Sequence, residues 1–98
     1  MLDLNTIEAH TSKLIFIAGT PYINVHVHYV DERTLMYFSM DIKFKDSQPT
    51  VENCLGFEQD EQLQILNLIT SRKELFFSMA KEQGILHVQS EEELEFVS

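Results

Sequence analysis

The chain has 98 residues, of which 44% are hydrophobic and 23% are charged, the size and composition of one folded domain rather than of a disordered chain. Sixteen acidic residues against seven basic ones give a net charge of -9, and no basic cluster exceeds Arg72-Lys73, which argues against direct binding to nucleic acid. One cysteine, Cys54, excludes an intramolecular disulfide, and the apolar stretch Leu14 to Ala18 is too short to span a membrane, so we expect a cytoplasmic protein with no membrane partner.

The N-terminal part of the chain is predicted to contain one helical turn and one buried strand. Asn5 and Glu8 stand at the spacing of a capping box, so Asn5 to His10 is expected to form the helical turn. Leu14 to Ala18 is apolar at every position, which is typical of a central strand covered on both faces.

Two longer β-rich runs follow and predict a β-meander. Tyr22 to Val30 and Thr34 to Phe44 are separated by Asp31-Glu32-Arg33, a connection short enough for a hairpin. Alternate residues of the second run share an apolar face, namely Met36, Phe38, Met40, Ile42 and Phe44. Lys45 to Gly56 contains few apolar residues, and we interpret it as a linker.

A long amphipathic helix is predicted from about Asp60 to Gln83. Asp60 suits the N-cap, and Gly84 suits the residue that ends the helix. The apolar residues of this segment fall on one broad face, namely Ile65, Leu66, Leu68, Ile69, Leu75, Phe76 and Met79. Ser71-Arg72-Lys73-Glu74 has the form of a capping box, so a break near Ser71 into two shorter helices is the alternative.

The C-terminal segment completes the predicted fold. Ile85 to Gln89 and Leu94 to Val97 are short and β-prone, with an acidic run between them, and they are expected to form a terminal strand or hairpin. The predicted fold class is therefore α+β, with an antiparallel β-meander covered by one long amphipathic helix, in a single acidic domain spanning residues 1–98.

Histidines at alternate positions of a predicted strand are a weak candidate metal site. His26 and His28 would project from the same side of the strand about 6.7 Å apart, and a zinc centre would need a third ligand. The sequence offers His87, His10 or Asp31 for that role. The alternative is that Asn24, His26 and His28 form the solvated face of a strand whose valines point inward. We expect no cofactor, and we expect Cys54 to be a buried or half-buried thiol without a catalytic role.

Negative charge is concentrated in the second half of the chain. Residues 46–98 hold eleven acids and three bases, so this half carries -8 of the net -9. If Glu91 to Phe96 is extended, Glu91, Glu93 and Glu95 project from one face about 6.7 Å apart and form an acidic ribbon resembling the phosphates of a nucleic-acid strand. Further acids that would extend this surface are Glu92, Glu58, Asp60 and Glu61. The alternatives are that these acids keep an edge strand from pairing, or only make the protein soluble.

The predicted helix supplies a second surface for interaction. Its apolar arc is wider than a helix lying on a sheet needs, with Leu63 and Phe77 at the margin. The surplus is either covered by the N-terminal segment or packs against a second copy of the chain.

These patterns favour a binding protein rather than an enzyme. The main expectation is a non-enzymatic inhibitor, of the immunity, antitoxin-like or phage-type kind, whose acidic face blocks a basic and nucleic-acid-binding surface of a target protein. The first alternative is a structural or assembly module that forms a homodimer through the helix. The second is a metal-binding protein that uses His26 and His28.

Overall fold

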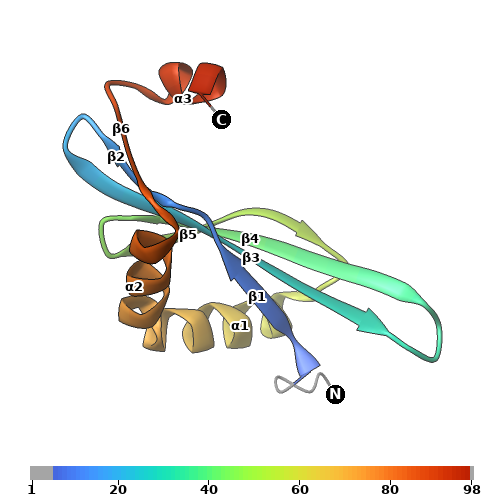
Figure 1. Ribbon diagram of the computed structural model, residues 1–98. Coiled ribbons are helices and arrows are strands. Elements are labelled where there is room, and N and C mark those ends of the chain that lie inside the picture. The colour runs from blue at the N-terminus through green and yellow to red at the C-terminus, as the bar shows by residue number, and fades with distance from the viewer. Residues whose placement is uncertain (1–5, 98) are drawn as a thin grey trace.

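The computed structural model describes residues 6–97, except for the side chains of residues 95–97. Within this range a mixed β-sheet packs against two helices, and a short third helix follows the last strand (Figure 1). The strands are β1 (Glu8–Thr11), β2 (Leu14–Ile17), β3 (Thr20–Asp31), β4 (Met36–Lys45), β5 (Gln48–Leu55) and β6 (Ile85–Val88). The helices are α1 (Gln59–Ser71), α2 (Lys73–Gln83) and α3 (Glu91–Val97). The predicted α+β class is confirmed.

The sheet has the strand order β5-β4-β3-β2-β6, and β1 also pairs with β3. At 12 residues β3 is long enough to pair with two short strands along one edge, with β2 near its start and with β1 through Val25 to His28. The pairing of β2 with β6 is parallel, whereas the other strand pairs among the described residues are antiparallel. The predicted meander is matched in part: β2, β3 and β4 pair consecutively and antiparallel, but β5 extends this arrangement and the parallel β6 makes the whole sheet mixed.

The core forms between the sheet and one side of α1 and α2. Side chains of β3 and β4 meet helix residues there, and the largest fully buried ones are Ile23, Val25, Val27, Met40, Ile42, Phe44 and Ile65. The predicted apolar face of residues 36–44 is therefore correct over its second half. Met36 is 56% exposed because the β3–β4 hairpin extends past the helices (Figure 1).

The helical region is two helices, so the prediction of one uninterrupted helix is wrong and its alternative, a break near Ser71, is correct. The Ser71 hydroxyl donates a hydrogen bond to the Leu68 carbonyl, and Arg72 has a φ of -114° between the two helices. At the start of α1, the N-cap is Glu58 rather than Asp60, and the backbone N–H of Glu58 donates to the Glu61 carboxylate. Gly84 ends α2 with a φ of 142°, which confirms the predicted stop.

Two segments predicted as irregular or helical are strands. The expected linker contains β5, which pairs with β4 and has few apolar residues because most of its side chains are exposed at the edge of the sheet. The expected helical turn is also wrong from Glu8 onward, since β1 occupies Glu8–Thr11, whereas Asn5 lies outside the described residues. In β1 the side chain of Ala9 packs toward the core, while those of Glu8 and His10 are exposed.

Of the predicted terminal strand or hairpin, the strand is confirmed as β6 and the hairpin is wrong. The strand β6 pairs with β2, and the chain then turns into α3 instead of returning as a second strand. The Ser90 hydroxyl accepts a hydrogen bond from the backbone N–H of Glu93, and the Glu93 carboxylate accepts one from the backbone N–H of Gln89. This reciprocal capping starts the helix and outweighs the β propensity of the residues that follow. In the described part of the chain, no helix is long and apolar enough to cross a membrane.

Candidate functional site

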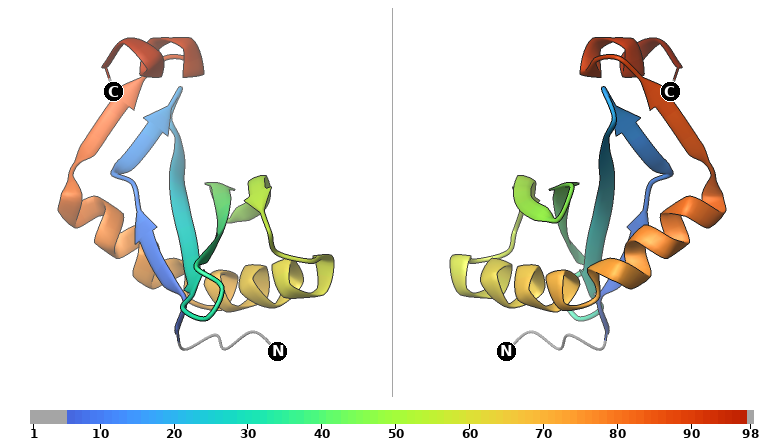
Figure 2. Two further views of the ribbon diagram at one scale, coloured as in Figure 1. Left: turned by 90° about the vertical axis from the view of Figure 1, so that its right-hand side faces the viewer. Right: turned by 90° about the vertical axis from the view of Figure 1, so that its left-hand side faces the viewer.

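The sheet face opposite α1 and α2 carries polar side chains from several strands. In Figure 1 these two helices lie below the sheet and α3 lies above it, and Figure 2 shows α3 at one end of the molecule. Along β3, Val25 and Val27 are buried in the core, so the alternating residues Asn24, His26 and His28 lie on the opposite face. The polar strand face that the sequence offered as an alternative is therefore present.

A hollow of about 400 Å³ lies on this face where the sheet meets α3. Ile15 and Ile17 from β2 and Leu94 from α3 provide apolar lining. The charged lining residues described by the structure are three acids, Asp41, Glu52 and Glu91, and one base, Lys43. These acids come from β4, β5 and α3, so folding gathers carboxylates that are far apart in the sequence.

Lys43 and Glu91 connect the sheet to α3 through an ion pair. The Lys43 Nζ donates a hydrogen bond of 2.6 Å to Glu91 Oε1, and it also lies 5.1 Å from the centre of the Tyr22 ring. The hydrogen bond from Lys43 lowers the pKa of Glu91 and raises the pKa of Lys43. The charge of Glu91 is thus partly neutralised within the molecule.

The predicted acidic ribbon is wrong, because Glu91–Val97 is a helix and its glutamates do not alternate along a strand. Glu91 pairs with Lys43, Glu93 caps its own helix, and Glu92 is exposed. The side chain of Glu95 lies outside the described residues. The remaining predicted acids, Glu58, Asp60 and Glu61, lie at the start of α1, away from α3 (Figure 2).

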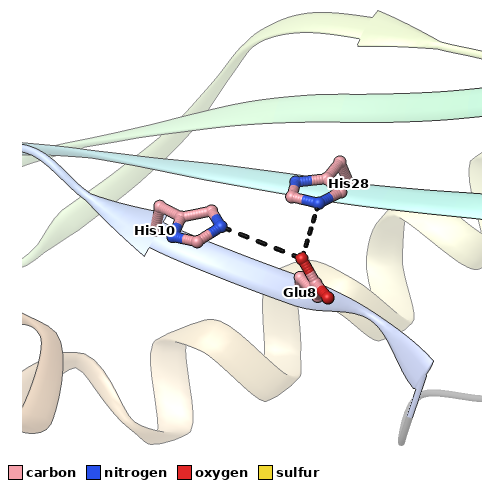
Figure 3. A group of neighbouring side chains, drawn as sticks. All are labelled: Glu8, His10 and His28. Carbon is pink, nitrogen blue, oxygen red and sulfur yellow. Dashed lines mark hydrogen bonds and ion pairs between the residues drawn. The ribbon is translucent and has the colours of Figure 1, made fainter.

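A second cluster joins β1 and β3 on the same face, and Figure 3 shows its three side chains. Glu8, His10 and His28 each place one potential ligand atom within 4.8 Å of the others. Glu8 Oε2 lies 2.8 Å from His28 Nε2 and 4.0 Å from His10 Nε2. The rings of His10 and His28 are stacked with their centres 5.4 Å apart.

The predicted pair of His26 and His28 does not share one ligand position. His26 Nδ1 instead lies 2.7 Å from Asp41 Oδ1, and its Nε2 lies 3.3 Å from the Tyr37 hydroxyl. Of the proposed third ligands, His10 approaches His28. His87 stacks on Phe16 instead, and the Asp31 carboxylate accepts a hydrogen bond from the backbone N–H of Arg33.

Glu8 was missed as a site residue because its spacing from Asn5 favoured a helical cap. Interpreted with the two-residue period of a strand, Glu8 and His10 share one face, and this signal could have identified the pair. The fact that His28 lies beside them follows only from the pairing of β1 with β3.

The residues predicted for a dimer surface lie in different surroundings. Leu63 on α1 is 58% exposed. Phe77 on α2 is half-buried and packs edge-on against Phe44, with ring centres 6.2 Å apart. The expectation that Cys54 is buried or half-buried is wrong, because its side chain is exposed on β5.

No protein family model matches this chain, and the comparisons with curated proteins and with solved structures found no match.

Proposed function

We propose that this is a non-enzymatic binding protein that inhibits a basic partner protein by accepting a lysine or arginine side chain in the hollow beside α3. The observation that carries the proposal is the gathering of Asp41, Glu52 and Glu91 around that hollow. These carboxylates suit a cationic head group, and the apolar residues beside them suit its methylene stem.

Lys43 occupies the position that a partner cation would compete for. Its side chain is 31% exposed and that of Glu91 is 62% exposed, so water screens their attraction and the pair is weak. An arginine of the partner would bind Glu91 with two parallel hydrogen bonds, while Asp41 and Glu52 supply further negative charge. The net charge of -9 would also speed the encounter with a basic surface.

Inhibition would follow from occupancy of the partner's basic surface. A target that binds nucleic acid uses lysines and arginines to neutralise phosphates, and these side chains cannot contact phosphates while they bind carboxylates. Glu92 adds charge beside Glu91, whereas Glu58, Asp60 and Glu61 form a separate acidic patch outside the hollow.

The test is to capture the partner from a lysate of the source organism, identify it, and titrate it against purified variants at low and high salt. Glu52→Gln with Glu91→Gln should weaken binding about tenfold or more, and most strongly at low salt, because the partner cation in the hollow loses two of its three carboxylates. The matched control is Glu74→Gln with Glu82→Gln, which removes the same charge from exposed positions on α2.

The result that would contradict this proposal is equal binding by the hollow variant and the α2 variant. Equal weakening would mean that net charge alone attracts the partner. Unchanged binding by both variants would mean that the partner contacts another surface.

A second candidate function is assembly of a homodimer through the helices. The observation that favours it is the exposure of large apolar side chains on their outer surface, with Leu63 58% and Leu75 55% exposed. Because Phe77 packs against Phe44 within the core, Leu63 is the better of the two predicted positions for a test.

A further inference from the structure

The cluster of Glu8, His10 and His28 arises from strand register. Glu8 is the direct cross-strand partner of His28, and His10 is the direct partner of His26. Since alternate residues of a strand project to one side, all four side chains lie on the face opposite the core. His10 is then the diagonal neighbour of His28, which explains how their rings come to stack.

We propose that Glu8, His10 and His28 bind a divalent transition metal ion such as Zn²⁺. Two imidazoles with one carboxylate form a ligand set that zinc accepts, and a fourth position remains for water or for a donor atom of a partner. Hard cations such as Mg²⁺ prefer sets made of oxygen atoms, so they should bind poorly here.

The distances fit this ion with small side-chain movements. In a tetrahedral zinc site the ligand atoms lie about 3.3 Å apart, as follows from bonds of about 2.0–2.1 Å to the metal. The distance from Glu8 Oε2 to His28 Nε2 is 2.8 Å and that to His10 Nε2 is 4.0 Å, one shorter and one longer than required. The side chains of Glu8 and His10 are 68% and 66% exposed, so little packing opposes the rotation that would equalise these distances.

The surroundings hold His28 more firmly than its two partners. Its side chain is 24% exposed, with the Tyr37 ring centre 6.1 Å away and the His26 ring centre 5.8 Å away. His26 in turn is fixed by Asp41. His28 would therefore be the anchored ligand, toward which Glu8 and His10 of β1 move.

Metal binding would stabilise the pairing of β1 with β3. The strand β1 has only four residues, and two of the three ligands belong to it. An ion that binds only the folded state raises the free energy of unfolding. At ion concentrations above Kd, this increase grows with the logarithm of the ratio of concentration to Kd. This proposal does not depend on the partner-binding hollow, since none of the three ligands lines that hollow.

The experiment is calorimetric titration of the full chain with Zn²⁺, with Mg²⁺ as the comparison ion, followed by absorption spectroscopy with Co²⁺. We expect one Zn²⁺ per chain and a visible Co²⁺ spectrum typical of tetrahedral coordination. His10→Ala and His28→Gln should each weaken Zn²⁺ binding by about tenfold or more. The control is His87→Ala, which removes a histidine outside the cluster and should leave binding unchanged.

Thermal unfolding provides a second measurement that does not depend on spectroscopy. Zinc should raise the Tm of the wild type and of His87→Ala by several degrees, and it should raise the Tm of His10→Ala much less. Because His10 is exposed, that variant should keep its fold, and circular dichroism would verify this. Equal zinc affinity in the wild type and in the double variant His10→Ala with His28→Gln would overturn the proposal, as would one-to-one binding of Mg²⁺ with the same affinity.

Discussion

At Gly56 the chain turns from β5 toward α1 with a φ of 90°, and the ring of Phe38 lies against the glycine Cα. A Cβ added there would lie 2.3 Å from Cδ1 of that ring, well inside any normal contact. Phe38 in turn packs against Phe57, with ring centres 5.6 Å apart. The glycine thus serves both the backbone conformation and the packing of an aromatic pair.

Replacement of Gly56 by alanine should destabilise the protein through both effects. Gly19→Ala is the matched control, because Gly19 has a similar φ of 86° but no atom within 4 Å of an added Cβ. We expect Gly19→Ala to lower the free energy of unfolding by about 1 kcal/mol, and Gly56→Ala to lower it by about 2–3 kcal/mol. Urea unfolding of both variants measures this difference, and equal losses would show that Phe38 moves aside at little cost.

For the histidines of β3, the sequence predicts the strand face on which they lie but not the residues that they contact. The period of a strand correctly placed His26 and His28 on one face. It could not show that His26 binds Asp41 or that Glu8 binds His28, because those contacts join residues 15 and 20 positions apart. Such contacts depend on strand register, and register is set by the pairing of whole strands.

The helix α3 is joined to the sheet by the ion pair between Glu91 and Lys43. Lys43 keeps the pKa of Glu91 below its ordinary value of 4.5, so the folded state binds fewer protons than the unfolded chain in that range. The contribution of the pair is therefore complete above pH 4.5 and is lost as the pH falls below it. The pKa of Lys43 is raised above 10.5, so the contribution is also lost as the pH rises beyond that value.

Amide hydrogen exchange in α3 measures this contribution. Exchange rates should increase when the pH is lowered below about 4.5, once corrected for the intrinsic effect of pH, and Glu91→Gln should remove that dependence. Glu92→Gln is the control, because Glu92 is exposed in the same helix and the dependence should persist. A dependence that persists in Glu91→Gln would assign it to another group.

Strands that bury many apolar residues could be predicted from the sequence, whereas elements that are mostly exposed could not. The strands β3 and β4 place alternate apolar residues in the core, and the stop at Gly84 follows from backbone conformation alone, so both were predictable. The strand β5 packs too little apolar surface to show a period, and the capping at Ser90 and Glu93 was interpreted as an acidic run. Local patterns therefore failed where an edge position or a cap decides the structure.

At the scale of the whole molecule, the exposed apolar residues of the helices, such as Leu63 and Leu75, offer a surface on which a second copy of the chain can pack. If a homodimer forms there, sedimentation should show a mass that increases with protein concentration, and Leu63→Ser should restore the monomer. Glu91→Gln should leave the dimer unchanged, because α3 lies away from α1 (Figure 2). A concentration-independent monomer would exclude this arrangement.

The parallel pairing of β2 with β6 has a consequence for the chain before it is fully folded. Leu14 pairs with Ile85, so one edge of the uncharged run Leu-Ile-Phe-Ile is covered only by a strand from the far end of the sequence. Until β6 arrives, that edge presents unpaired backbone groups beside four apolar side chains, the combination that promotes aggregation between chains. The strand β6 thus covers an apolar edge of the first half of the chain, and it reaches that edge because α2 ends at Gly84.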